Sequence, residues 1–290
     1  MAQEQKLVLI TGATEGVGKQ TAIQLAAKGF NIVMMVRNKA KAELAKSEIL
    51  AAAPNVQVDY ILVDLTSFKQ VRAAAKQFND KYPKLDVLIN NAGLMYPDKK
   101  ITEDGFELCF QTNHLSHFIL TDLLLDKLKQ SKQGRIINLS SEGHRMGKFD
   151  PDNFNAEKGY ASVGQYCFTK LCNLYFTYSL ADKLKGTNIT VNAVHPGVVA
   201  SGFGSDHDKG WLKPIFAISR LFMINNEQGA HTSVFLASDP SVAKVTGKYF
   251  KNSKVTASKG LSYNTGNQKI LWDYSVAKTG AFKELAAVSR

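Results

Sequence analysis

The stretch KLVLITGATEGVGK, residues 6–19, decides how the rest of the chain is interpreted. Residues 6–10, KLVLI, are predicted to form a buried strand, because a short apolar run bounded by turn residues is typical of a strand covered on both faces. A turn with Gly12, Gly16 and Gly18 follows, and a helical pattern then begins. Glycines permit a sharp turn and a close approach of the backbone to a ligand, and the free N–H groups at a helix start favour a pyrophosphate. The G-x3-G-x-G spacing differs from the G-x-G-x-x-G fingerprint, and a tight turn without a ligand is the alternative interpretation. The position directly after a buried first strand favours the phosphate.

Apolar runs and helical patterns alternate through most of the chain. The further predicted strands cover residues 31–36, 56–63, 85–89, 135–140 and 188–194, and the predicted helices cover 17–29, 38–53, 67–80, 113–130 and 164–185. Strands separated by helices of this length imply parallel crossovers. The predicted fold is therefore α/β, a doubly wound parallel sheet (Rossmann fold) of about seven strands with helices on both faces. We expect one domain over residues 1–290, because no linker, repeat or low-complexity tract interrupts the pattern.

The composition excludes several classes of partner. Lys and Arg number 36 against 25 Asp and Glu, which gives a net charge of +11. Such a field can serve nucleic acid, an anionic membrane or a phosphate-bearing cofactor. The basic residues are spread along the chain without dense runs, so no nucleic-acid partner is expected. No apolar stretch of about 20 residues predicts an integral membrane segment, and the N-terminus lacks the features of a signal peptide. The three cysteines show no metal or CxxC spacing, which favours a reducing environment and a cytoplasmic location.

The end of the second predicted strand indicates which dinucleotide binds. An acidic side chain at that point accepts a hydrogen bond from the ribose 2′-OH, whereas an Arg accommodates a 2′-phosphate. Here the strand ends with Val36 and Arg37, and the next carboxylate is Glu43. This pattern favours NADP(H). Glu15 in the glycine turn is a counter-signal if it faces the adenosine ribose, and a solvated charge at a strand end is the alternative interpretation of Arg37.

The stretch GQYCFTKLCN, residues 164–173, places Tyr166 and Lys170 four positions apart on a predicted helix. Side chains at i and i+4 lie on one face, so the phenol and the ammonium point into the same space. Hydride transfer to a carbonyl builds negative charge on oxygen, which needs a waiting proton donor. A cation within about 4–6 Å lowers the pKa of a Tyr by roughly 1–3 units, so we expect Lys170 to lower the pKa of Tyr166. A core Tyr beside a snorkelling Lys is the alternative.

Further motifs occur in a fixed order along the chain. They are TGATEGVG at 11–18, Asp64-Leu65, NNAG at 90–93, Asn113 in TNHLSHF, INLSS at 137–141, Tyr166-x3-Lys170 and HPGVVAS at 195–201. Together they resemble the short-chain dehydrogenase/reductase family over essentially the whole chain. Within it, TNHLSHFIL, TKLCNLYFTYSLADKL and ILWDYS are most similar to the retinol-dehydrogenase-like branch. NNAG with DGFELCFQTNHLSHF is also similar to the light-dependent protochlorophyllide reductases.

The resemblance implies a role for each matching residue. The implied catalytic residues are Tyr166 as proton donor, Ser141 as hydrogen-bond donor to the substrate oxygen, Lys170 on the nicotinamide ribose and Asn113 at a water relay. Ser141 is preferred over Ser140 because its position in INLSSEGH matches the family serine. The implied cofactor-binding residues are Gly12, Thr14, Glu15, Gly16, Val17, Gly18, Arg37, Asp64, Leu65, Asn91, Ala92, Gly93, Tyr166, Lys170, Pro196, Gly197, Val198 and Ser201. Asp64 and Leu65 would contact the adenine region, and Pro196 to Val198 would hold the nicotinamide amide.

The histidines are assigned no metal. His195 beside Pro-Gly is interpreted as a packing or turn residue, and His114, His117 and His144 lack a carboxylate or Cys that would complete a ligand set. Residues 201–229 form an apolar segment, in which helical spacing places five side chains on one face: Leu212, Ile215, Phe216, Phe222 and Met223. We interpret it as a substrate lid, with simple core or a membrane-surface patch as alternatives.

The predicted function is NADP(H)-dependent reduction of a hydrophobic aldehyde or ketone, or oxidation of the alcohol. One alternative is light-dependent reduction of a carbon–carbon double bond, as in the protochlorophyllide reductases. Another is a non-catalytic NADP(H)-binding regulator. The family also includes homodimers that pair through long helices resembling residues 113–130 and 164–185, so a homodimer is possible.

Overall fold

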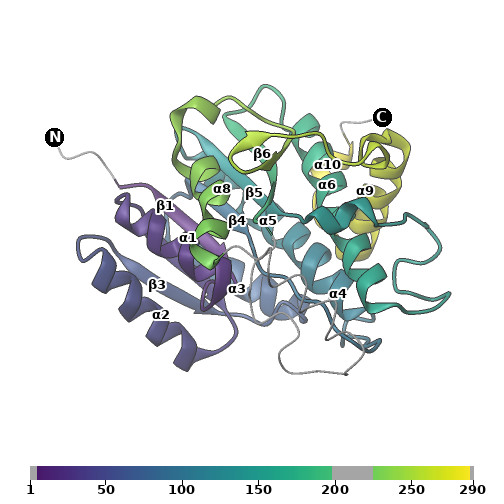
Figure 1. Cartoon of the computed structure of the whole chain (residues 1–290), viewed down its shortest axis with the longest axis horizontal. Coiled ribbons are helices and arrows are strands. Elements are labelled where there is room, and N and C mark those ends of the chain that lie inside the picture. Colours follow the sequence, from purple (N-terminus) through teal and green to yellow (C-terminus); the bar gives the residue numbers. More distant parts are fainter. Residues whose placement is uncertain (1–4, 198–224, 288–290) are drawn as a thin grey trace.

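The computed structural model of the chain describes residues 5–197 and 225–287. An eight-stranded sheet crosses them in the order β3-β2-β1-β4-β5-β6-β7-β8 (Figure 1). The strands are β1 (Leu7–Thr11), β2 (Asn31–Val36), β3 (Val58–Leu62), β4 (Val87–Asn90), β5 (Gly134–Leu139), β6 (Ile189–His195), β7 (Lys248–Lys251) and β8 (Lys254–Val255). All neighbours pair in parallel except β7 and β8. The predicted doubly wound α/β fold is confirmed.

Helices cover both faces of this sheet. Their bounds are α1 (Gly16–Ala27), α2 (Lys39–Ala52), α3 (Phe68–Lys81), α4 (Leu108–Phe110), α5 (Ser116–Lys129), α6 (Ser162–Lys183), α8 (Asn226–Ser238), α9 (Thr265–Thr279) and α10 (Lys283–Ala287). Buried side chains of α1, α2 and α8 form one apolar cluster with the sheet, and those of α3, α5, α6 and α9 form another. The two clusters are the two halves of a three-layer core.

The six predicted strands all exist, with ends that differ by at most two residues. The predicted helix at 113–130 is longer, because α4 leads through a π-helical turn, η1 (Gln111–Leu115), into α5. The elements after residue 225 were not predicted. Helix α8 begins inside the predicted lid and packs on α1, so residues 226–229 form the start of a helix that covers the sheet. The rest of that lid, residues 201–224, lies outside the described residues.

The C-terminal helices α9 and α10 lie beside α6 (Figure 1). Trp272 of α9 packs with its ring centroid 5.1 Å from that of Phe118 in α5 and 6.4 Å from that of Phe176 in α6. Phe282, between α9 and α10, lies 4.8 Å from Phe118 by the same measure. These aromatic rings cover part of the two long helices through which a homodimer was considered. Among the described helices, none is both long and apolar enough to cross a membrane.

Candidate active site

The candidate site lies where the carboxyl ends of β1, β4, β5 and β6 meet in the middle of the sheet. Strand β4 sits beside β1, so the direction of winding reverses between them. In open parallel sheets the ligand crevice forms outside the carboxyl ends at this switch point. The glycine turn follows β1, NNAG follows β4 and the serine pair follows β5, so the topology brings these three predicted motifs together.

The glycine turn is built for a close backbone approach. Gly12 and Gly16 have φ of +67° and +60°, a left-handed conformation that a side chain disfavours. A Cβ on Gly18 would lie 2.3 Å from the Gly12 carbonyl oxygen and 2.4 Å from Asn91 Nδ2. Glu15 occupies the N-cap of α1 without a side-chain hydrogen bond to the helix. The first N–H groups of α1, beside Thr14 and Val17, therefore fit a pyrophosphate.

Thr11, the last residue of β1, ties the glycine turn to NNAG. Its hydroxyl oxygen accepts hydrogen bonds from the backbone N–H groups of Asn91 (3.0 Å) and Ala92 (2.9 Å). In return, Asn91 Nδ2 donates to the carbonyls of Thr11 (2.8 Å) and Gly12 (3.1 Å). Thr11 was not predicted as a site residue. Its position between a buried strand and the first glycine was the available signal.

The adenosine end of the crevice carries mixed charges. Arg37 follows β2 and is exposed. Glu15 forms an ion pair with Lys41 of α2 at 2.9 Å, so its carboxylate is held by a cation. Asp64 caps the turn after β3, since its Oδ1 accepts from the N–H (2.9 Å) and hydroxyl (2.8 Å) of Thr66. The next residue, Leu65, is buried.

Ser141, Tyr166 and Lys170 converge at the nicotinamide end of the crevice. The hydroxyl of Ser141 hydrogen-bonds that of Tyr166, and its oxygen also accepts from the Gly143 N–H at 3.1 Å. Lys170 Nζ lies 5.4 Å from the centroid of the Tyr166 ring and 3.3 Å from the Leu139 carbonyl oxygen. The hydroxyl of the neighbouring Ser140 is buried and donates to the Lys170 carbonyl at 2.8 Å. Ser141 therefore faces the site and Ser140 faces the interior.

The pKa of Tyr166 does not follow the prediction from sequence. The side chain keeps some exposed surface, but its hydroxyl end is surrounded by protein, and this burial raises its pKa to about 12. The hydrogen bond from Ser141 opposes that rise. Burial likewise lowers the pKa of Lys170 to about 8. The expectation that Lys170 lowers the pKa of Tyr166 is wrong, because desolvation of the phenol is the largest effect and the effect that opposes it comes from Ser141.

Asn113 lies inside the π-helical turn η1, a feature that often marks functional sites. Both atoms of its side-chain amide are hydrogen-bonded: Oδ1 accepts from the Leu94 N–H (2.8 Å), and Nδ2 donates to the Leu94 carbonyl (2.9 Å) and to Thr169 Oγ1 (3.0 Å). A Cβ on Gly93 would lie 3.1 Å from Lys170 Nζ and 3.4 Å from Asn113 Oδ1. Gly93 therefore leaves room for the ammonium at the crevice floor.

The first described range of the chain ends, after β6, with His195, Pro196 and Gly197. His195 is buried and its Nδ1 accepts from the Glu142 N–H at 3.4 Å, while burial lowers its pKa to about 4, as a packing residue requires. Gly197 has φ of +96°. Val198 and Ser201 lie outside the described residues.

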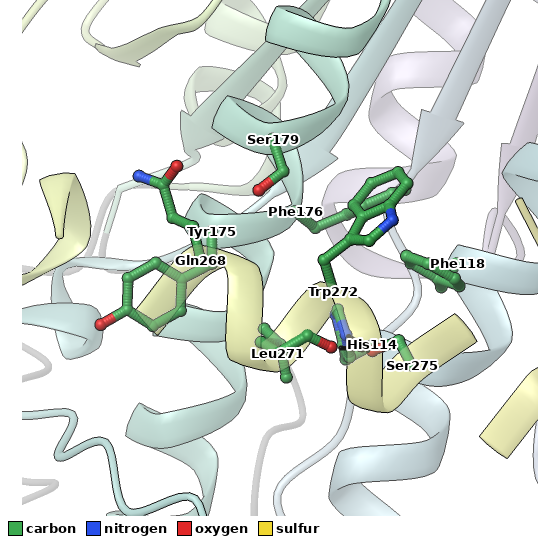
Figure 2. A pocket seen from close by; sticks show the side chains of 9 residues that line it. All are labelled: His114, Phe118, Tyr175, Phe176, Ser179, Gln268, Leu271, Trp272 and Ser275. Atoms are coloured by element: carbon green, nitrogen blue, oxygen red, sulfur yellow. Dashed lines mark hydrogen bonds between the residues drawn. The ribbon is translucent and has the colours of Figure 1, made fainter. Parts of the chain in front are cut away.

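No group of His, Cys, Asp and Glu side chains in the described residues could hold a metal ion. A hollow of about 150 Å³ lies between α6 and α9 (Figure 2). It is lined by His114, Phe118, Tyr175, Phe176, Ser179, Gln268, Leu271, Trp272 and Ser275. That volume includes open solvent, and its enclosed part has no room for a water molecule. None of these residues belongs to the crevice, so this hollow is a packing feature.

A doubly wound sheet with a glycine turn at its switch point and a Ser, Tyr and Lys set beside it defines the class of dinucleotide-dependent oxidoreductases. Residues 6–210 match the family described as short chain dehydrogenase. The chain belongs to that family, as the resemblance from sequence predicted.

Similar proteins indicate to which branch of this family the chain is related. Retinol dehydrogenase 14 of Homo sapiens is 40% identical over 293 residues, covering 96% of this chain and 87% of that protein. Retinol dehydrogenase 11 of Mus musculus is 40% identical over 274 residues, covering 93% and 85%. The chain is thus an oxidoreductase related to retinol dehydrogenases.

Solved structures support the same fold. The crystal structure of an uncharacterized protein from Mycobacterium paratuberculosis has a TM-score of 0.77 at 30% identity, with 96% of this chain and 94% of that chain covered. A variant of actinorhodin polyketide ketoreductase, solved with NADPH, has a TM-score of 0.68 at 25% identity, with 86% and 97% covered.

Proposed function

We propose that this protein is an NADP(H)-dependent oxidoreductase that reduces a hydrophobic aldehyde or ketone and, in reverse, oxidises the corresponding alcohol. The observation that carries the proposal is the convergence of Ser141, Tyr166 and Lys170 beside Gly93. The Ser141 hydroxyl is hydrogen-bonded to that of Tyr166, and Lys170 Nζ lies 5.4 Å from the Tyr166 ring. The site thus holds a proton donor, a second hydroxyl and a cation at one end of a dinucleotide crevice.

The chain's own residues account for the proton chemistry. When bound, the reduced nicotinamide supplies the hydride to the carbonyl carbon. Tyr166 gives its phenolic proton to the carbonyl oxygen, and Ser141 donates a hydrogen bond to the same oxygen. A raised pKa keeps the phenol protonated at neutral pH, which is the form that reduction needs. Lys170 would hold the nicotinamide ribose and stabilise the phenolate that remains.

Two charges support NADP(H) as the cofactor. Arg37 is exposed directly after β2, where a 2′-phosphate would lie. Glu15, whose carboxylate would instead suit a free ribose hydroxyl, forms an exposed ion pair with Lys41 at 2.9 Å, so a cation lies beside it. Both features favour a phosphate over a hydroxyl at this point of the crevice.

The substrate class is supported by the relatives, which are named for retinol, a lipophilic alcohol. We therefore propose a lipophilic aldehyde or alcohol as the substrate. The retinoid itself is one member of the panel that the experiment must cover.

The test follows NADPH absorbance with lipophilic aldehydes, in darkness and in light, for the wild type and Tyr166→Phe. Tyr178→Phe is the matched control, since it removes a hydroxyl from the same helix that hydrogen-bonds Ser258 at 2.7 Å. We expect turnover in darkness that Tyr166→Phe reduces by at least 100-fold, in the range for general acid catalysis, and that Tyr178→Phe preserves. Turnover only in light would favour double-bond reduction, and NADPH binding without any turnover would favour the non-catalytic regulator.

A further inference from the structure

His117 of α5 is a buried imidazole in direct contact with two parts of the candidate site. Its Nε2 lies 2.9 Å from the hydroxyl oxygen of Thr11, and its Nδ1 lies 3.2 Å from the carbonyl oxygen of Asn113. Only 2% of the residue is exposed. Thr11 belongs to the cofactor side of the crevice, and Asn113 belongs to the side on which Lys170 lies.

The hydrogen-bond partners fix where the ring carries its proton. The Thr11 oxygen already accepts two hydrogen bonds, from the backbone N–H groups of Asn91 and Ala92. Its own hydrogen is therefore free to be given, and Nε2 of His117 accepts it. A carbonyl oxygen can only accept, so Nδ1 carries the hydrogen and donates it to Asn113. The Asn113 contact requires a hydrogen on Nδ1 and the Thr11 contact requires a non-protonated Nε2, so together they define the neutral Nδ1–H form.

The surroundings also exclude a charged ring. Burial, with the positive charge of Lys170 nearby, lowers the pKa of His117 to about 4. A second ring hydrogen would point at the Thr11 oxygen, whose accepting capacity is already used. The imidazole consequently stays neutral throughout the working pH range.

We propose that His117 is a positioning residue that sets the cofactor-binding turn and the Asn113–Lys170 side of the site at a fixed separation. The proposal rests on the proposed function for its kinetic consequences. Thr11 directly precedes Gly12, and its hydroxyl holds the residues that lead into Gly93. Asn113 is held at its side chain by Leu94 and Thr169 and at its carbonyl by His117. The imidazole is therefore the link between the pyrophosphate turn and the wall behind Lys170.

Two substitutions separate the two contacts. An Asn side chain places its amide nitrogen near the position of Nδ1, so His117→Asn keeps the bond to Asn113 and loses the bond to Thr11. A Gln side chain reaches the position of Nε2, so His117→Gln keeps an acceptor for Thr11 and loses the donor to Asn113. We expect His117→Asn to raise the Kd for NADPH about tenfold and to leave kcat within about twofold. We expect His117→Gln to lower kcat about tenfold and to leave the Kd within about twofold.

His114→Gln is the matched control on the preceding turn. His114 is also fully buried, but its Nε2 bonds Ser275 at 3.1 Å in the hollow between α6 and α9, away from the crevice (Figure 2). This variant is expected to lower the melting temperature while leaving the Kd and kcat of the folded protein unchanged. If both His117 variants change Kd and kcat by equal factors, in step with their loss of melting temperature, His117 only fills space and the proposal fails.

A readout that needs no turnover keeps the proposal separate from the proposed function. In the wild-type chain labelled with ¹⁵N-histidine, His117 should show the neutral Nδ1–H form, with a non-protonated Nε2, from pH 6 to 8. The Nε2–H form or a titration in this range would overturn the assignment even if the enzyme is active. A protein that shows the expected form and the expected split in NADPH affinity, but reduces no aldehyde, would contradict the proposed function alone.

Discussion

Lys170 Nζ lies 5.4 Å from the centre of the Tyr166 ring, one helical turn along α6, and burial moves the pKa values of the two groups apart. The pKa of the Tyr166 phenol rises to about 12, and the pKa of the Lys170 ammonium falls to about 8. With these pKa values both groups are protonated at neutral pH. This is the state required for reduction, whereas oxidation of an alcohol must first remove the phenolic proton.

The first prediction concerns the pH dependence of reduction. kcat/KM for NADPH reports the pKa values of the enzyme before the cofactor binds. It should stay constant through neutral pH and fall above about pH 8, because Lys170 then loses its charge while Tyr166 remains protonated to about pH 12. A profile that is constant to pH 10, or one that falls near pH 6, would show that Lys170 does not control this step. Initial rates at saturating aldehyde provide the measurement.

The second prediction concerns stability. The folded chain holds the Lys170 proton less tightly than the unfolded chain, whose lysine has the ordinary pKa of 10.5. The unfolded state thus binds more protons between pH 8 and 10.5, so the contribution of this group to stability rises with pH across that window, by up to about 3 kcal/mol. Urea unfolding of the wild type and Lys170→Met at pH 7.5 and 9.5 measures the difference. Between pH 7.5 and 9.5 the free energy of unfolding of the wild type should rise relative to that of Lys170→Met. Equal changes in the two proteins would contradict the lowered pKa of Lys170.

The sequence was sufficient to predict the first six strands and the helices between them, because each is a strong apolar run or helical pattern bounded by turn residues. It was insufficient for α9. The buried face of that helix contains Ser275 and Thr279 beside Leu271 and Trp272, so its apolar stripe is interrupted. The two hydroxyls are satisfied locally, by the carbonyls of Leu271 (2.8 Å) and Ser275 (2.6 Å), and such back-bonding leaves no periodic signal.

The candidate site shows the same division. The i, i+4 spacing predicted that Tyr166 and Lys170 share a face, because helix geometry alone decides that. The direction of the Tyr166 pKa shift depends on tertiary burial, which spacing does not contain. The contact between Thr11 and His117 joins residues 106 positions apart, so no local pattern could reveal it.

The third prediction tests the choice of cofactor. Arg37→Asp should weaken NADPH binding by about 100-fold and leave NADH binding within about threefold, since it replaces the charge expected at the 2′-phosphate with a carboxylate that suits a hydroxyl. Lys132→Asp makes the same charge change at an exposed position just before β5, at the amino ends of the parallel strands and away from the carboxyl ends where Arg37 lies. Fluorescence titrations of both cofactors give the comparison. Equal losses for the two dinucleotides would mean that Arg37 does not contact the phosphate.

The fourth prediction uses two glycines with opposite surroundings. A Cβ at Gly18 would lie 2.3 Å from the Gly12 carbonyl, so Gly18→Ala forces the turn away from Asn91 and should cost about 1–3 kcal/mol of stability as well as cofactor affinity. Gly164 opens the first turn of α6, and its added Cβ would meet only Ala161 Cβ at 3.6 Å. Gly164→Ala should raise stability by about 0.5–1 kcal/mol. Denaturant unfolding of both variants measures these changes in stability. A Gly18→Ala variant as stable as the wild type would refute the tight packing of this turn.

The last prediction concerns the aromatic contact between α9 and the two long helices. Trp272 is 4% exposed and packs on Phe118 and Phe176, so Trp272→Ala should cost about 3–5 kcal/mol. Trp272→Phe keeps an aromatic ring and removes an indole N–H that has no hydrogen-bond partner within the described residues. Because removing an unsatisfied buried donor relieves a desolvation cost, Trp272→Phe should lower the stability of the fold by about 1 kcal/mol or less. Because α9 already covers this face of α5 and α6, we expect a single chain in sedimentation experiments for the wild type. A dimer that Trp272→Ala abolishes would instead place the pairing surface at these helices.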